Sequence, residues 1–545
     1  MHVTHAPTHT EAGHPDMSTQ KFRPMACRSD GFGPPQSAQV GRGLLAAVLC
    51  AMALMGAGCQ SGEAVEAAPP GSVGLPARPA QRPNIIVIVA DDLGFGDIGV
   101  NGGRIPTPNI DALAASGVRM VEGYTTAAVC APSRAALMAG RQQTRFGFEF
   151  NPAGRDTQRG MSQQETTIAQ TLGAAGYRTG IVGKWHLGQA AGYTPLDRGF
   201  DSFFGILGGA TPYLTAIRAE DLHVETAEDR LITRDRLPVF DGRTRVEPEA
   251  YLTDVFTDRA IAFTQAADAR PYFLYLAYTA PHTPLQAPAR YVARVGEQPS
   301  DFHRAYAAMV IALDDGIGRL VRHLKETGAY ENTMIIFLSD NGCASYVGGA
   351  CTNAPLKGWK GYPWDGGIRV PFIVSWPGRL APTVHAGPVS ALDIAATAAA
   401  AAGTTHPGAE GHDLVALLQS SASRPDRALF WRMGPTRIVR DGRWKLIIVN
   451  RAAPTASGAE SDDLARSMRP DGIPAVVSEL GQWTLLYDLE ADPTETVNLA
   501  ERRPDVVRDL QAKWERWDAA NVPPQWTSRR GVAAEVDGMR VEMFN

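Results

Sequence analysis

The chain has 545 residues, of which 44% are hydrophobic and 20% are charged, and its formal net charge is −5. This is an ordinary globular composition, long enough to bury one large core and a second, smaller one. The mild acidic excess argues against nucleic acid as a partner, and it means that any site for an anion must be local.

Residues 1–59 are interpreted as a leader rather than as part of the fold. Arg42 precedes an apolar stretch, residues 44–55, and small residues then lead to Cys59. The stretch is too short for a comfortable membrane span and fits the hydrophobic region of a signal peptide. Small residues before a cysteine resemble a bacterial lipoprotein processing site, although Gly56 stands where that pattern prefers Leu. We expect an exported chain, periplasmic or anchored in the outer membrane only by a lipid on Cys59. A plain cleaved signal peptide and an uncut anchor are the alternatives.

Residues 60–82 follow the leader and are rich in Ala, Pro and Gly, with no hydrophobic period. This composition predicts a flexible tether. The folded part is therefore expected to begin at Pro83.

Four apolar runs beyond this point end abruptly in polar residues. They cover residues 84–92, 179–188, 272–284 and 333–342. Continuous apolar runs of this length predict strands that are buried on both faces. Residues 165–176 and 305–328, which lie between these runs, have helical patterns, and the second carries one apolar stripe. The stripe consists of Leu313, Ile317, Leu320, Val321 and Leu324. The alternation predicts an α/β fold with a mostly parallel sheet, whose ligand lies beyond the carboxyl ends of the strands.

Hard oxygen ligands follow two of these runs, namely Asp91, Asp92, Asp340 and Asn341. Each alone could be a turn or a helix cap. Together they suit Ca²⁺, and Mg²⁺ less well, and they argue against zinc. Carboxylates that converge also need a positive charge to stay ionised.

Cationic groups form the counterpart of this acidic set. They are Arg134, Lys184, His186, His282 and Lys360. Such groups around a metal would hold a small, multiply charged oxyanion, and histidine can also move protons. The alternative is that the histidines belong to the core and the lysines to the surface. Spacing alone does not favour Lys360 over Lys357.

Cys130 is the cysteine that the sequence leaves without a partner. Three of the six cysteines lie in the leader, and Cys343 and Cys351 share one Gly-rich loop. In an oxidising compartment these two predict a disulfide, with two free thiols as the alternative. Residues 131–141 predict a helix that stops at Gly140, which places Cys130 at the positive end of the helix dipole.

Three interpretations of Cys130 remain open at this point. It is a small buried residue, a thiolate nucleophile of low pKa, or a cysteine oxidised to another group. Arg134 follows by four residues and lies on the same helix face. A cysteine phosphatase would place its arginine six residues on, so this spacing does not match that class.

The stretch CAPSRAALMAGR resembles the signature of the sulfatase family, Cys (or Ser)-x-Pro-Ser-Arg followed by Gly-Arg. Other blocks resemble that family in the same order: RPNIIVIVADDLGFGD, GKWHLG, PHTP, SDNG and PLKGWKGYPWDGGIRVPFIVSWPG. The resemblance covers residues 82–377, and a weaker resemblance continues to the end of the chain. It implies an alkaline phosphatase-like fold, a large mostly parallel sheet sandwiched by helices with a smaller C-terminal antiparallel α+β domain.

The resemblance also implies the chemistry. Cys130 would be converted to formylglycine before folding by a formylglycine-generating enzyme, and one hydroxyl of the aldehyde hydrate would attack the sulfur of a sulfate ester. Asp91, Asp92, Asp340 and Asn341 match the ligands of one Ca²⁺, which residue 130 also touches.

The cationic residues match family positions as well. Arg134 matches the residue that steadies the hydrate, and Lys184 and His186 match the flanking pair, with His186 as the base. His282 and Lys360 match residues that hold sulfate and protonate the leaving oxygen, so the resemblance selects Lys360 over Lys357. One departure is Asp365, which stands where the family often has Glu.

We therefore predict a catalytic domain at residues 83–426 and a smaller domain at residues 427–545. Short strands and turns at residues 428–449 and 483–500, and a helix at residues 503–520, support the second. The expected activity is hydrolysis of an aryl or carbohydrate sulfate. The alternatives are a phosphonate or phosphate ester hydrolase that uses the same formylglycine, and a non-catalytic surface lipoprotein in which Cys130 is not converted.

Overall fold

A computed structural model describes residues 82–152, 158–224, 238–420, 427–450, 476–477, 481–526 and 531–544. The predicted leader, the lipid anchor on Cys59 and nearly all of the predicted tether lie outside these residues. Among the described residues, no helix is both long and apolar enough to cross a membrane.

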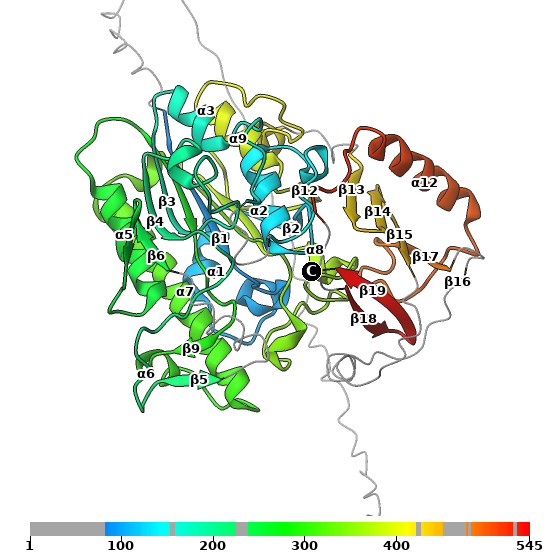
Figure 1. The fold of residues 1–545 in the computed structure, drawn as a ribbon, viewed down its shortest axis with the longest axis horizontal. Coiled ribbons are helices and arrows are strands. Elements are labelled where there is room, and N and C mark those ends of the chain that lie inside the picture. The colour runs from blue at the N-terminus through cyan, green and yellow to red at the C-terminus, as the bar shows by residue number, and fades with distance from the viewer. Residues whose placement is uncertain are drawn as a thin grey trace, which may run out of the picture. The chain divides into compact units, whose positions relative to one another are not determined.

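A ten-stranded sheet forms the centre of the larger part, in the order β12-β2-β11-β10-β1-β8-β3-β4-β6-β7 (Figure 1). Five neighbouring strands in its middle run parallel: β10 (Thr333–Ser339), β1 (Asn84–Ala90), β8 (Tyr272–Ala277), β3 (Arg178–Lys184) and β4 (Ser202–Ile206). The remaining strands are β2 (Val118–Tyr124), β6 (Val239–Asp241), β7 (Thr244–Val246), β11 (Phe372–Ser375) and β12 (Thr383–Ser390). The four apolar runs are confirmed as strands of this parallel block, and each strand ends before its run does, with Lys184 as the last residue of β3.

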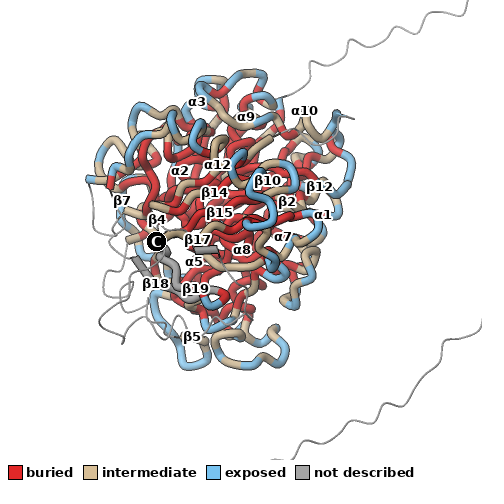
Figure 2. The backbone as a smooth tube through the Cα atoms, turned by 90° about the vertical axis from the view of Figure 1, so that its right-hand side faces the viewer, coloured by how far each residue is buried: buried red, intermediate tan, exposed pale blue. Residues whose placement is uncertain are grey.

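Helices cover both faces of the sheet because alternate residues of each central strand point to opposite sides. In β1, Ile86 and Ile88 pack with α1 (Pro108–Ala115), α5 (Leu252–Gln265) and α7 (Asp301–Glu326). Ile85 and Val87 pack with α2 (Cys130–Ala139), α3 (Ile168–Ala174) and α9 (Asp393–Ala401). The predicted stripe of α7 is confirmed as its core face, with Val321 only partly buried at its edge. In Figure 2, β10 and the strands of a second sheet, β14 and β15, run through the buried interior.

The second sheet is antiparallel and lies near the C-terminus. It has the order β13-β14-β15-β17-β16. Its strands are β13 (Leu429–Met433), β14 (Thr436–Asp441), β15 (Trp444–Asn450), β16 (Val476–Val477) and β17 (Gln482–Asp488). Helix α12 (Pro504–Asp518) packs on one face through Leu510 and Trp514. The opposite face, which includes Trp431, packs against Tyr124 and Trp364 of the larger part. The predicted smaller α+β unit is confirmed, while the domain limits at residues 426 and 427 stay a prediction.

Short elements complete the described chain. The strands are β5 (Leu222–Val224), β9 (Leu285–Ala287), β18 (Gly531–Val536) and β19 (Met539–Phe544), and the helices are α6 (Ala289–Val292), α8 (Asp365–Ile368) and α10 (Leu414–Gln419). The 3-10 helices are Phe95–Asp97, Gly99–Asn101, Gln143–Arg145, Pro195–Asp197, Tyr330–Asn332 and Ser345–Val347.

Candidate active site

The candidate site lies where the carboxyl ends of β10, β1, β8 and β3 meet. These four strands are neighbours and parallel, so the residues that follow them gather at one edge of the sheet. The residues concerned are Asp91, Asp92, Lys184, His186, His282, Asp340 and Asn341. The sheet topology therefore brings together groups that lie up to 250 residues apart in the chain.

Asp91 and Asp340 are held by two cations. Lys184 donates from Nζ to both carboxylate oxygens of Asp91, at 2.9 and 2.8 Å. Arg134 donates from Nε to Oδ2 of Asp340 at 2.8 Å. Burial acts to raise the pKa of Asp91, but the charge of Lys184, with other nearby cations, outweighs burial and holds that pKa well below its ordinary value. Burial raises the pKa of Asp340 to about 6 although Arg134 opposes the shift.

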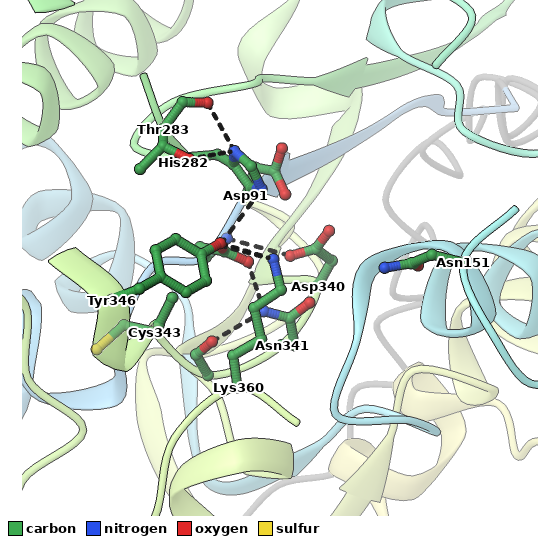
Figure 3. Close-up of polar contacts among 12 residues, drawn as sticks. Asp91, Asn151, His282, Thr283, Asp340, Asn341, Cys343, Tyr346 and Lys360 are labelled. Carbon is green, nitrogen blue, oxygen red and sulfur yellow. Dashed lines mark hydrogen bonds and ion pairs between the residues drawn. The ribbon is translucent and has the colours of Figure 1, made fainter. Parts of the chain in front are cut away.

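Asp92 is the centre of a second set of contacts (Figure 3). Lys360 donates from Nζ to its Oδ2 at 2.8 Å, and Asn341 donates from Nδ2 to its Oδ1 at 2.7 Å. Nε2 of His282 lies 3.6 Å from the same Oδ2. Burial would raise the pKa of Asp92, yet Lys360 and His282 hold it below its ordinary value. Asp92 also has a φ of 62°, a left-handed conformation that is costly for a residue with a side chain and is concentrated at functional sites.

The donor set fits a hard cation such as Ca²⁺. Asp91, Asp92, Cys130 and His282 each offer one ligand atom, and these atoms lie within 4.8 Å of one another. Oδ1 of Asn341 is buried and has no hydrogen-bond partner among the described residues, which suits an oxygen that binds a cation. The carboxylates already face Arg134, Lys184 and Lys360, so the need for positive charge does not by itself call for a metal. The fit to a hard cation rests on the carboxylates of Asp91 and Asp92 and on the unpartnered oxygen of Asn341, since Cys130 and His282 offer sulfur and nitrogen.

Cys130 is the first residue of α2 and is 2% exposed. Burial raises the pKa of its thiol to about 12, so an unmodified Cys130 would be a neutral thiol at pH 7. This argues against the interpretation as a thiolate nucleophile of low pKa. Ser133 of the same helix donates from Oγ to the carbonyl oxygen of Ala127 at 2.7 Å and so fixes the turn that leads into the helix. Gly140 ends the helix with a φ of 61°, as the sequence predicts.

The two histidines differ in their surroundings. Burial, together with Lys184 and Arg134, lowers the pKa of His186 well below its ordinary value, so this ring is neutral at pH 7. Its Nδ1 has no hydrogen-bond partner within the described part of the chain. His282 donates from Nδ1 to the carbonyl oxygen of Thr283 at 2.7 Å, which turns Nε2 toward the site (Figure 3). A neutral ring with an open nitrogen can accept a proton, and a ring fixed in this way can orient a donor.

All the predicted site residues therefore meet in one place, and the structure separates the two candidate lysines. Lys360 reaches Asp92, whereas Lys357 contacts Asp537 and the carbonyl oxygen of Glu495 in the C-terminal part. The disulfide between Cys343 and Cys351 is also confirmed. Of the aromatic residues near Lys360, Trp364 and Tyr362 are buried core residues.

Sequence reasoning missed two residues at the site. Tyr346 donates from its hydroxyl to Oδ2 of Asp92 at 3.1 Å, and the carbonyl oxygen of Thr283 orients His282. The position of Tyr346 between Cys343 and Cys351, in the loop that follows Asn341, was a usable signal. The role of a backbone carbonyl leaves no mark in a sequence.

Asp365, the departure from the family pattern, has a structural role. Its Oδ1 accepts from Nζ of Lys445 at 2.7 Å, and the same Nζ lies 2.8 Å from Oε1 of Glu495. All three side chains are 0% exposed, and the cluster joins α8 to the antiparallel sheet. Gly367 of α8 accepts a hydrogen bond from the backbone N of Gly342 at 3.0 Å, directly after Asn341. The second sheet is thus connected to the loop that carries two candidate metal ligands.

Comparison with known proteins adds an independent line of evidence. The family model described as Sulfatase matches residues 83–404. Arylsulfatase A of Homo sapiens is 33% identical over 459 residues, covering 79% of this chain and 87% of that protein. N-acetylgalactosamine-6-sulfatase of Mus musculus is 30% identical over 459 residues, covering 78% of this chain and 84% of that protein. The crystal structure of Ps i-CgsB is 32% identical with a TM-score of 0.70, covering 82% of this chain and 95% of that chain. The alkaline phosphatase-like architecture is thereby confirmed, and the chain belongs to the sulfatase family, as an arylsulfatase-like enzyme that hydrolyses sulfuric esters.

Proposed function

We propose that this enzyme cleaves a carbohydrate or aryl sulfate monoester through a formylglycine made from Cys130, with one Ca²⁺ bound by Asp91, Asp92, Asp340 and Asn341. The observation that carries the proposal is the arrangement around Cys130. The sulfur of a buried cysteine at the start of a helix lies within 4.8 Å of potential ligand atoms of two aspartates and a histidine, with Lys184 and Lys360 close by.

Formylglycine and Ca²⁺, the two groups that the proposal implies, would have different parts in the reaction. A formylglycine hydrate at position 130 would supply the nucleophilic oxygen, and a bound divalent cation would supply positive charge that eases deprotonation of that oxygen. The chain's own residues do the remaining work. Lys184 and Lys360, whose ammonium groups contact Asp91 and Asp92, would supply countercharge to the oxygens of a sulfate bound beside them. Arg134 fixes Asp340 and so keeps that side of the site rigid.

The histidines take the proton transfers in this proposal. His186 is neutral and has an open Nδ1 among the described residues, so it suits the role of base. His282 presents Nε2 with Nδ1 tied to Thr283, and together with Lys360 it suits protonation of the leaving oxygen.

A sulfated carbohydrate is the substrate class that the relatives favour. Ps i-CgsB has been crystallised in complex with k-i-k-neocarrahexaose, and that chain is 32% identical to this one. N-acetylgalactosamine-6-sulfatase is a second relative whose name specifies a sugar sulfate. We propose that aryl sulfates are surrogate substrates of the same site.

Export of the enzyme is part of the proposal. The disulfide between Cys343 and Cys351 supports an oxidising compartment. The proposed form is a periplasmic or outer-membrane lipoprotein attached through Cys59, matured by a formylglycine-generating enzyme before folding.

The test combines a mass measurement with kinetics on the full chain, produced together with a formylglycine-generating enzyme. The peptide that contains residue 130 should be lighter than its sequence predicts, and 4-nitrophenyl sulfate should turn over faster than 4-nitrophenyl phosphate. Lys360→Ala should lower kcat/KM for the sulfate by about 100-fold or more, because the oxygens of the sulfate lose a countercharge. Lys357→Ala is the matched control and should leave turnover near that of the wild type. An intact thiol without sulfatase activity would indicate the unconverted surface lipoprotein, and faster phosphate turnover would indicate the phosphatase alternative.

A further inference from the structure

We propose that Tyr346 is a positioning residue for Lys360, held in place by the disulfide-closed loop at residues 343–351. This inference rests on the proposed function above, and it extends that function to leaving-group preference. The residue lies in the 3-10 helix Ser345–Val347, between the two bridged cysteines.

The hydroxyl of Tyr346 links a carboxylate and an ammonium group (Figure 3). It donates to Oδ2 of Asp92 at 3.1 Å and accepts from Nζ of Lys360 at 3.3 Å. Nζ of Lys360 also donates to the same Oδ2 at 2.8 Å, so the three polar atoms form a triangle. The ammonium group lies 5.8 Å from the centroid of the tyrosine ring as well.

A lysine needs this kind of support to act at a defined point. Its four-carbon stem is flexible, and its ammonium group has no preferred direction of its own. Two fixed acceptors, Oδ2 of Asp92 and the hydroxyl of Tyr346, restrict where Nζ of Lys360 can lie. Removal of the hydroxyl takes away one of the groups that hold Nζ and gives the ammonium group a wider range of positions.

The disulfide-closed loop is anchored on both sides of Tyr346. Cys343 and Cys351 are 0% and 3% exposed, and their Cα atoms lie 6.2 Å apart. The backbone N of Lys360 donates to the carbonyl oxygen of Cys343 at 2.9 Å. Cys343 also donates from its backbone N to Oδ1 of Asn353 at 3.0 Å. The loop thus contacts Lys360 at two points. Cys343 binds the backbone N of Lys360, and Tyr346 binds its ammonium group.

The functional consequence concerns the leaving oxygen. A leaving group with a high pKa needs a proton as the ester bond breaks, whereas an acidic phenol leaves with little help. Phenol, with a pKa of about 10 like the tyrosine side chain, is the more demanding leaving group, and 4-nitrophenol is the less demanding one. If Tyr346 positions Lys360 for this proton transfer, loss of the tyrosine hydroxyl must lower kcat/KM for phenyl sulfate more than kcat/KM for 4-nitrophenyl sulfate.

The experiment compares these two esters on the converted full-length enzyme. Tyr346→Phe keeps the ring and removes the hydroxyl, and it should lower kcat/KM for phenyl sulfate about 10-fold more than for 4-nitrophenyl sulfate. In a Lys360→Ala background the same change should have no further effect on the ratio. Tyr330→Phe is the matched control, because its hydroxyl contacts Oγ of Ser116 at 3.2 Å near the opposite end of β10.

A second variant tests the loop itself. The double change Cys343→Ala and Cys351→Ala should reproduce the leaving-group effect of Tyr346→Phe, and if this variant does not fold, Tyr346→Phe decides alone. Equal loss for both esters, or no loss for either, would overturn the role of Tyr346. A converted wild type that hydrolyses neither ester would instead overturn the proposed function, and this inference with it.

Discussion

The buried cluster behind the site gives the sharpest stability prediction. Nζ of Lys445 lies 2.7 Å from Oδ1 of Asp365 and 2.8 Å from Oε1 of Glu495, and all three side chains are 0% exposed. Lys445→Met keeps much of the aliphatic volume but removes the positive charge between two buried carboxylates. Tyr124 and Arg369 still contact Asp365, whereas Glu495 loses its cation.

The expected loss of folding stability is large, because removal of Lys445 leaves the charge of Glu495 buried and uncompensated. Breaking a buried ion pair in this way typically costs about 3–5 kcal/mol. We expect the free energy of unfolding, measured by urea denaturation, to fall by about that amount in Lys445→Met. Lys513→Met is the matched control, since Lys513 also pairs with two aspartates, Asp441 and Asp509, but is 34% exposed. Its loss should cost about 0–1 kcal/mol.

A third variant separates charge from packing. Combining Lys445→Met with Glu495→Gln removes the carboxylate that has lost its cation, while Asp365 keeps its contact with Arg369, and the combination should recover part of the lost stability. The prediction is wrong if the free energy of unfolding of Lys445→Met lies within about 1 kcal/mol of the wild-type value. It is also wrong if Lys445→Met loses no more of this free energy than Lys513→Met does.

Three further predictions concern the site and its surroundings. Ca²⁺ added to chelator-treated enzyme at about 100 times its Kd should raise the free energy of unfolding by about 2.7 kcal/mol, and an unchanged unfolding curve would contradict the metal assignment. Burial raises the pKa of Asp97 from 3.8 to about 7, so the stability contributed by this group is complete below about pH 4 and is lost as pH rises through 7. When the free energy of unfolding is measured with urea across this pH range, Asp97→Asn should not show the loss of stability that Asp97 causes in the wild type. A Cβ at Gly209 would lie 3.0 Å from Cε1 and Nε2 of His186, so Gly209→Ala should shift the ring by a few tenths of an ångström and lower kcat by up to about 10-fold. Unchanged kcat would argue against His186 as the base.

Much of the fold was predictable because local sequence patterns reflect burial directly. The continuous apolar runs at β1, β3, β8 and β10 indicated strands covered on both faces, and the stripe of α7 identified its core face. The exact strand ends were less predictable, because each run in the sequence continues for a few residues beyond the last residue of its strand. The antiparallel strand β11 (Phe372–Ser375), which lies between β2 and β10, is short and carries no distinctive period.

The sequence by itself determined the chemical groups of the site. Polar residues at the ends of apolar runs and the signature around Cys130 could be read from residue type and order. The loop with Cys343 and Cys351 indicated a disulfide, with two free thiols as the alternative, and the structure confirms the disulfide. Only the tertiary structure decided which groups touch. It directed Lys360 to Asp92 and Lys357 to the C-terminal part, and it assigned Asp365 to a buried ion cluster. The physical reason is that a strand's pattern records whether a residue is buried, whereas the partner of a buried charge is set by which strands become neighbours in the sheet.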